Sequence, residues 1–296
     1  MSRLGRLRPK LLTRLRWGLA ALLLGLLALD LAFPPPLPQR RDTSTLVTAR
    51  DGTPLRAFAD AEGVWRYPAS AAQVSPLFLQ ALLGYEDRWF WWHPGINPVA
   101  LLRAGGQLLR HGRIVSGGST LSMQVARILD PHSRTPWGKV KQMLRAVQLE
   151  VHLSKAQILQ LYLERAPYGG TIEGVEAASW AYLGKSAAQL SHAEAALLAV
   201  LPQAPSRLRP DRHPEAAQRA RDKLLVRLQQ QGTWGAEQVE DARVETVVTR
   251  SLRPPLHAAL LAQRLHAAHR DEARIRSSID IQLQRTLEER VASYFS

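Results

Sequence analysis

An apolar run directly after a basic N-terminus constrains this chain more than any other feature. Residues 1–16 carry six Lys or Arg and no acidic residue, and residues 17–29 carry no charge. This order is typical of a membrane helix whose basic flank stays in the cytoplasm. The run approaches the ~20 residues of a spanning helix only if it continues past Asp30 toward the prolines at 34–36, which stop a helix. We therefore predict three segments: a basic cytoplasmic segment at 1–16, a transmembrane anchor at 17–33 and a polar linker at 34–43.

Two other interpretations of the run stay open. A cleaved signal peptide has the same basic and apolar parts, but no clear small-residue cleavage site follows the run. A buried helix of a globular core is disfavoured by the cations directly before it. The net charge is +14, of which +6 lies in residues 1–16, which leaves +8 for the rest. Because part of the excess is explained by membrane orientation, we expect no nucleic-acid partner.

The sequence beyond the linker has the pattern of a mainly α domain. Ser75-Pro76 is a typical helix start, and Ser154 with Gln157 and Ser191 with Glu194 form capping boxes. Gly184 follows a periodic run and predicts a helix end. Without cysteine, the fold cannot use disulfides and needs an ordinary hydrophobic core.

The domain limits follow from the same patterns. Weak alternation around Asp51-Gly52 predicts a small β-hairpin within 44–67. The helical pattern ends near residue 246. We predict one domain over 44–246, and over 247–296 a linker with the start of a truncated further region.

Residues 139–153 show two faces of an expected helix. We predict that the apolar face packs into the core; it comprises Val140, Met143, Leu144, Val147 and Val151. The other face carries Lys139, Gln142, Ala146 and Glu150. It could line a cleft, although a solvated face is the more common outcome of such a pattern.

Glu86 is the first candidate for chemistry. It precedes a stretch with four aromatic residues, Trp89 to Trp92. A general base needs a carboxylate near the reacting hydroxyl, and apolar surroundings raise the pKa of a carboxyl toward the working pH. An acidic pair at a solvated helix end is the structural alternative, and the aromatic residues could equally be core or membrane-interface residues.

The second candidate is a glycine-rich helix start at 117–120. Free N–H groups at a helix N-terminus attract anions, and glycine lets the backbone approach a ligand. Gln124 and Arg127 follow one and two turns later, where they could contact phosphate oxygens. A simple capped glycine turn is the alternative. No Gly-Lys-Ser/Thr follows, so this is not a nucleotide P-loop.

Together these stretches resemble the glycosyltransferase family 51 domain of class A penicillin-binding proteins, and its 1C branch in particular. Two motifs carry the resemblance, and further matches continue in order to about residue 230. Their residues are Glu86, Asp87, Arg88, Phe90, His93 and Gly95, then Gly117, Gly118, Ser119, Thr120, Gln124 and Arg127. The Ser-x-x-Lys and Lys-Thr-Gly motifs of the penicillin-binding transpeptidase are absent from these residues, so we expect no transpeptidase activity from this chain.

The resemblance implies a mainly helical, lysozyme-like fold and polymerisation of lipid II into β-1,4 glycan strands, with inversion and release of undecaprenyl diphosphate. Glu86 is then the base at the acceptor hydroxyl. The substrate-binding residues implied are Asp87, Arg88, His93, Gly118, Ser119, Thr120, Gln124, Arg127, Lys139 and Glu150. No organic cofactor and no dedicated metal ligands are expected, but a divalent cation (Mg²⁺ or Mn²⁺) is allowed at the diphosphate.

One departure from the family bears on this site. The family usually has a second catalytic glutamate where this chain has Gln142, and an arginine where it has Gly138. Glutamine can hydrogen-bond a diphosphate, but it carries no charge and holds a metal less strongly. Either the second carboxylate is dispensable, with Gln142 in its catalytic place, or activity is weak. Glu164 also stands where the family usually has asparagine.

Two further functions compete with polymerisation: a lytic enzyme of the lysozyme type, which also depends on one Glu, and a catalytically weak scaffold that binds lipid II. The expected partners are lipid II, the growing glycan strand, the inner membrane and other cell-wall synthesis proteins. The expected location is the bacterial inner membrane, with a single pass, a cytoplasmic N-terminus and a periplasmic catalytic domain.

Overall fold

The computed structural model describes residues 8–38, 44–60, 62–111, 118–133, 135–246 and 255–295. Gly117 and parts of both predicted linkers lie outside these ranges. The chain divides into two units, Met1–Leu37 and Pro38–Ser296. The first contains one helix, α1 (Arg8–Ala32), which includes basic and apolar residues without a break at residue 16. No helix in the described part of the chain is long and apolar enough to cross a membrane, so the anchor predicted at 17–33 is not confirmed.

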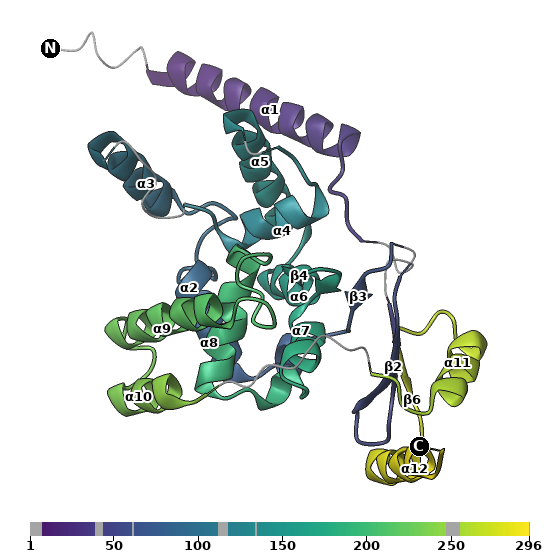
Figure 1. Ribbon diagram of the computed structural model, residues 1–296. Coiled ribbons are helices and arrows are strands. Elements are labelled where there is room, and N and C mark those ends of the chain that lie inside the picture. Colours follow the sequence, from purple (N-terminus) through teal and green to yellow (C-terminus); the bar gives the residue numbers. More distant parts are fainter. Residues whose placement is uncertain are drawn as a thin grey trace, which may run out of the picture. The chain divides into compact units, whose positions relative to one another are not determined.

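The second unit is mainly helical with two small sheets (Figure 1). Its helices are α2 (Pro76–Glu86), α3 (Pro98–His111), α4 (Leu121–Leu129), α5 (Pro136–His152), α6 (Lys155–Arg165), α7 (Val175–Tyr182), α8 (His192–Val200), α9 (Pro214–Gln230), α10 (Ala236–Val244), α11 (Ala259–Ala268) and α12 (Ile281–Phe295). Its short 3-10 helices are η2 (Ala71–Gln73), η3 (Ala187–Gln189) and η4 (Leu201–Gln203). Its strands are β1 (Thr45–Thr48), β2 (Pro54–Phe58), β3 (Trp65–Arg66), β4 (Pro167–Gly169), β5 (Ile172–Glu173) and β6 (Arg274–Arg276).

Helix α8 forms the centre of the core. Every residue from Ala195 to Val200 is buried, and α8 packs against both α2 and α9. A helix that is apolar on all sides has to be enclosed by its neighbours. Because α2 ends at Glu86, this packing fixes the position from which that carboxylate is presented.

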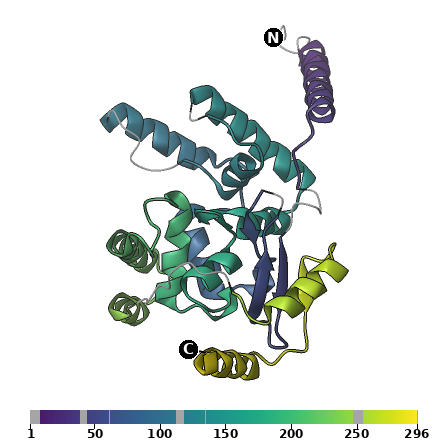
Figure 2. The same ribbon diagram turned by 45° about the vertical axis from the view of Figure 1, so that its right-hand side comes forward.

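The predicted hairpin is present, and a strand from the C-terminal region joins it. Strands β1 and β2 pair antiparallel, with Val47 opposite Arg56, and β6 pairs parallel to β1, with Ile275 opposite Val47. Helix α11 lies against the same two strands (Figure 2). Val47, Leu55 and Ile275 share a small hydrophobic cluster. The boundary predicted after residue 246 stays a prediction.

The predicted helix ends are confirmed where a side chain or a glycine specifies them. Ser154 and Ser191 each form the complete capping box, and Ser75 caps α2 ahead of a proline in its first turn. Gly184 has φ 73° and donates its N–H to Ser179 O, which ends α7. These motifs work through local hydrogen bonds, which explains why the sequence was enough to place them.

The prediction for the faces of α5 is wrong. Most of the predicted core face is outside, with Leu144 62% exposed and Val151 75% exposed, and only Met143 of that face packs against the core. The buried residues of α5 are Gly138, Gln142, Ala146 and Leu149. Helix α4 packs against this narrow face, where small side chains allow close approach. The face expected to lie in solvent or line a cleft therefore meets α4, and the face expected in the core is exposed.

Candidate active site

Glu86 is the last residue of α2, and its carboxylate meets α4. Glu86 Oε2 accepts a hydrogen bond of 2.7 Å from Gln124 Nε2. Burial raises the pKa of the Glu86 carboxyl above its ordinary value of 4.5, while the Gln124 hydrogen bond and the charge of Arg227 act against that rise. A carboxylate with a raised pKa, held by one amide, has the properties of a general base.

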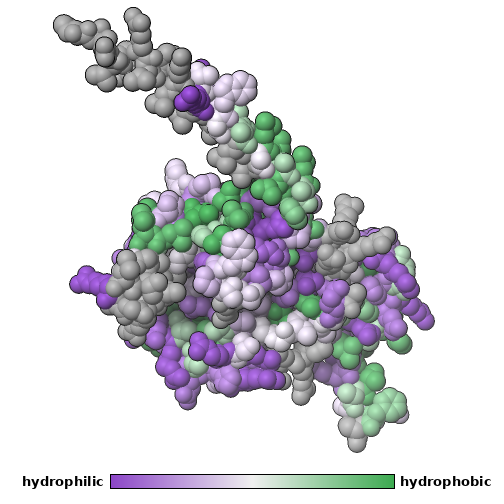
Figure 3. Space-filling model, turned by 90° about the horizontal axis from the view of Figure 1, so that it is seen from above, coloured by the Kyte–Doolittle hydropathy of each residue, from purple (hydrophilic) through white to green (hydrophobic). Residues whose placement is uncertain are grey.

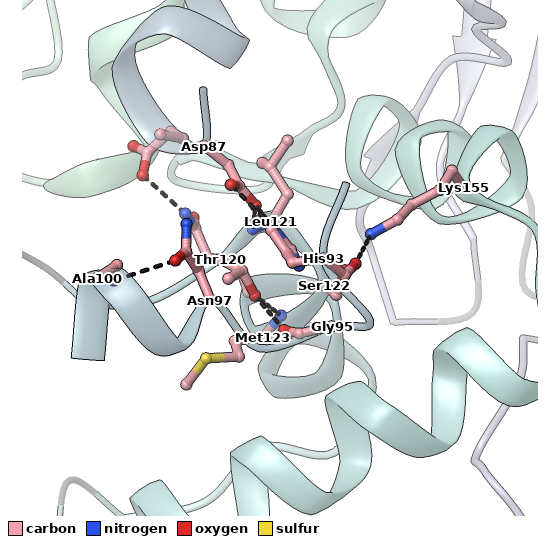
Figure 4. Close-up of polar contacts among 12 residues, drawn as sticks. Asp87, His93, Gly95, Asn97, Ala100, Thr120, Leu121, Ser122, Met123 and Lys155 are labelled. Atoms are coloured by element: carbon pink, nitrogen blue, oxygen red, sulfur yellow. Dashed lines mark hydrogen bonds and ion pairs between the residues drawn. The ribbon is translucent and has the colours of Figure 1, made fainter. Parts of the chain in front are cut away.

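Asp87 ties the end of α2 to the start of α4. Its Oδ2 accepts the backbone N–H of Leu121 at 2.9 Å, and both of its oxygens lie within 3.0 Å of His93 Nε2. Figure 4 shows Asp87 between His93 and Leu121. Both Asp87 and His93 are only 6% exposed. Asp87 and His93, expected to bind substrate, are therefore placed where they position Glu86 relative to α4.

Thr120 links the glycine-rich start of α4 to the loop before α3. Its Oγ1 accepts the N–H of Met123 as the N-cap and donates to Gly95 O at 2.5 Å (Figure 4). Gly95 has φ 85°, and a Cβ there would lie 2.7 Å from Ala146 O on α5. The loop can pass this close to α5 only with glycine at residue 95.

We expect Gly95→Ala to destabilise the domain more than a strained backbone alone would. A positive φ costs a non-glycine residue about 1–2 kcal/mol, and the contact with Ala146 O adds to it. Gly52→Ala is the matched control, since Gly52 has φ 92° but no atom within 4 Å of an added Cβ. The free energy of unfolding from urea titration should fall further for Gly95→Ala than for Gly52→Ala, and equal losses would contradict the steric argument.

Two cations belong to the site, one near the start of α4 and one in its last turn. Lys139 Nζ, on the first turn of α5, donates to Ser119 Oγ, and Gly118 and Ser119 are partly exposed. Arg127 lies in the last turn of α4. Burial first, and then the positive charge of Arg127, lower the pKa of Lys139. Two cations that repel each other beside a hydroxyl make a site that an anion stabilises.

Gln142 and Glu150 are both engaged by protein groups. Gln142 is 4% exposed; its Nε2 donates to Met123 O at 2.6 Å and its Oε1 accepts from Lys139 Nζ at 3.1 Å. Glu150 pairs with Lys155 Nζ at 2.7 Å and accepts a hydrogen bond from Ser122 Oγ. Neither side chain is free to meet a substrate as placed. Gln142, expected among the catalytic residues, instead connects α4 to Lys139, because both the nitrogen and the oxygen of its amide are hydrogen-bonded to protein groups.

Lys155 is a site residue that sequence reasoning did not single out. Its Nζ donates to His93 O at 2.6 Å (Figure 4). It also lies 4.5 Å from the centre of the Phe90 ring. It therefore holds the loop that follows Glu86. In the sequence, Lys155 lies between the capping residues Ser154 and Gln157, and no pattern there indicates a role in the site. Arg227, from α9, is a second such residue, and no sequence signal pointed to its charge acting on Glu86.

The predicted site is thus brought together around α4. Gln124 and Arg127 lie on α4 itself, and the side chain of Gln124 donates to Glu86. Ser119 precedes the helix and accepts a hydrogen bond from Lys139. Arg88 is exposed just after the Asp87 tie. The arrangement places a proton acceptor, bonded to Gln124 of α4, in the same region as two cations, Arg127 on α4 and Lys139 on α5.

Comparison with known proteins gives a consistent result. A family model described as "Transglycosylase" matches residues 51–229. Penicillin-binding protein 1C of Escherichia coli (strain K12) is 55% identical over 260 residues, which cover 88% of this chain and 34% of that protein. Penicillin-binding protein 1A of Aquifex aeolicus (strain VF5) is 42% identical over 178 residues, covering 60% of this chain and 24% of that protein. This chain spans about a third or less of the length of these relatives.

Among solved structures, a crystal structure of penicillin-binding protein 1A from Haemophilus influenzae matches with a TM-score of 0.40 and 20% identity. The match covers 81% of this chain and 27% of that one. The likeness is too low to support any inference.

Proposed function

Because this chain belongs to the transglycosylase family, we propose that it is a peptidoglycan glycosyltransferase that polymerises lipid II into β-1,4 glycan strands. The reaction inverts the anomeric carbon and releases undecaprenyl diphosphate. The observation that carries the proposal is the pairing of a general base with an anion site: Glu86 is bonded to Gln124 on the helix whose two ends carry Ser119 and Arg127. The lysozyme-like arrangement of the family is part of the same proposal.

The position and the pKa of Glu86 indicate how the proton of the acceptor hydroxyl is transferred. The ionised carboxylate takes the proton of the acceptor sugar hydroxyl while that oxygen bonds to the anomeric carbon of the donor. The bond from that carbon to the diphosphate breaks, and its electron pair leaves with the diphosphate. The raised pKa of Glu86 makes it a stronger base than an ordinary carboxylate once it is ionised.

The negative charge of the leaving group is met by the two cations of α4 and α5. Arg127 and Lys139 neutralise the diphosphate oxygens, and the hydroxyl of Ser119 orients Lys139. Donors held in place before the reaction stabilise developing charge without reorganisation. A lytic enzyme would have no diphosphate to release, so these two cations favour polymerisation over strand cleavage.

The test is incubation of the full chain with labelled lipid II and, separately, with preformed glycan strands. We expect long products from lipid II and no shortening of strands, read by gel or size-exclusion analysis. Shortened strands would establish the lytic alternative. Binding of lipid II without any product would establish the scaffold.

An exposed apolar face supports work on a lipid-linked substrate. It is formed by large side chains of α5 and α3: Trp137, Val140, Leu144, Val147, Val151, Val99 and Leu102. Figures 1 and 2 place α3 and α5 on the same side of the second unit, and Figure 3, seen from above, shows hydrophobic residues (green) gathered there. A patch of this kind marks a binding surface. We infer that it lies against the bilayer that holds the lipid carrier.

We expect Leu144→Glu to raise the KM for lipid II in vesicles about tenfold. Burying one leucine contributes about 1.5–3 kcal/mol, and each 1.4 kcal/mol is about a factor of ten. A water-soluble, short-chain analogue of lipid II should show no such change. Val244→Glu on α10 is the control, since Val244 is 75% exposed but not part of the apolar face. Equal KM changes for both substrates would contradict bilayer contact.

The proposed location follows from the N-terminal pattern. We propose that the basic residues before the apolar run stay on the cytoplasmic side of the inner membrane and that the catalytic unit lies in the periplasm. Fusion of a reporter enzyme to either end of the chain would test this orientation.

A further inference from the structure

We propose that Gln142 is a positioning residue that holds Lys139 at the diphosphate site with its charge uncompensated, so that this site works without a divalent cation. The inference rests on the function proposed above. It concerns the position at which this chain has glutamine where its family usually has a second catalytic glutamate.

The contacts of Gln142 require an amide. Its Nε2 donates to Met123 O at 2.6 Å, and its Oε1 accepts from Lys139 Nζ at 3.1 Å. An amide offers a donor and an acceptor at its two ends, whereas an ionised carboxylate offers only acceptors. A glutamate here would bring one oxygen against the Met123 carbonyl in a buried setting, where an unmatched polar contact is costly.

The hydrogen bond from Lys139 to the uncharged amide of Gln142 leaves the positive charge of Lys139 uncompensated. Lys139 Nζ is bonded to Ser119 Oγ and Gln142 Oε1, and neither group is charged. Within the described residues, the structure pairs neither Lys139 nor Arg127 with a carboxylate. A glutamate at residue 142 would form an ion pair with Lys139 and so cancel half of the positive charge that meets the diphosphate.

The donor set around this site does not fit a divalent cation. Mg²⁺ and Mn²⁺ favour carboxylate oxygens, but Asp87 is bound by His93 and Leu121 N–H, and Glu150 by Lys155 and Ser122. In the part of the chain that the structure describes, no group of three or more His, Asp or Glu side chains could hold a metal ion. The divalent cation that the family resemblance allows at the diphosphate stays an expectation, which the rates with and without metal test.

Two measurements on the full chain in detergent test this. The first is the initial rate of elongation from lipid II in EDTA and with Mg²⁺ or Mn²⁺, which should agree within about twofold, since no charge-neutralising step depends on the metal. A loss of more than about tenfold in EDTA, restored by the metal, would overturn the inference. The second is binding of inorganic pyrophosphate in EDTA by calorimetry, which should be detectable without metal.

Variants of Gln142 separate charge from packing. Gln142→Glu should weaken pyrophosphate binding in EDTA about tenfold, and the neutral Gln142→Met by only about threefold, because only the glutamate cancels the charge of Lys139. Equal losses in both would mean a purely structural role and would contradict the inference. Gln148→Glu, which adds the same charge on α5 beside Arg145, is the matched control and should bind as the parent does.

Different results contradict the proposed function and the proposed role of Gln142. A chain that makes no polymer under any condition contradicts the proposed function, while pyrophosphate binding in EDTA still decides the role of Gln142. If Gln142→Glu does not fold, the comparison of rates with and without metal in the unaltered chain still gives the answer.

Discussion

Replacing Glu86 by glutamine is expected to lower the rate of glycan elongation by about 10²–10⁴, the usual contribution of a general base. The substitution keeps the shape of the side chain, and the amide oxygen can still accept the hydrogen bond of Gln124. Only the ability to take a proton is lost. The initial rate with labelled lipid II measures the effect, and Glu237→Gln, on an exposed turn of α10, is the control. Retained elongation would exclude Glu86 as the base.

The Glu86→Gln variant is also expected to change how the stability of the fold depends on pH. The pKa of Glu86 is raised in the folded protein, mainly by burial, so the folded state binds this proton more tightly than the unfolded chain. The stability that the protonated carboxyl contributes is present below pH 4.5 and is lost as the pH rises through the raised pKa. The glutamine variant has no such loss. Its Tm relative to the unaltered chain should therefore rise with pH, and a difference independent of pH would contradict burial of the charge.

Replacing Asp87 by alanine is expected to cost about 2–5 kcal/mol of unfolding free energy, because each buried donor left without an acceptor costs about 1–3 kcal/mol. The loss leaves His93 Nε2 and the N–H of Leu121 without the acceptor that both now share. It also separates the end of α2 from the start of α4. Elongation should fall with stability, because Glu86 is the neighbour of Asp87 and depends on the same connection.

Urea titration at constant pH measures this loss, with Asp241→Ala as the control. Asp241 is an exposed residue of α10, where truncation is expected to change stability by no more than about 0.5 kcal/mol. A cost below about 1 kcal/mol for Asp87→Ala would show that the connection between α2 and α4 is held by other contacts.

Sequence motifs that act through nearby backbone groups gave correct predictions in this chain. The prediction of which helix face packs against another helix was wrong. The capping boxes at Ser154 and Ser191 act through backbone groups three residues away, so the sequence contains everything that they need. The two faces of α5 are different. The pattern shows that Leu144 and Gln142 lie on different faces, but not which face meets α4.

The sequence by itself determined the candidate residues and the order of their motifs. It predicted Glu86, Gln124 and Arg127 from residue types and spacing, and Lys139 from the resemblance to a known family. Only the tertiary structure decided that Asp87, His93 and Glu150 bind protein groups and that Lys155 holds the loop after Glu86. It also decided that the amide oxygen of Gln142 accepts a hydrogen bond from Lys139. The physical reason is that charge compensation and burial are set by contacts between separate elements, α2, α4, α5 and α6, and the sequence pattern of one element does not show which face of another it meets.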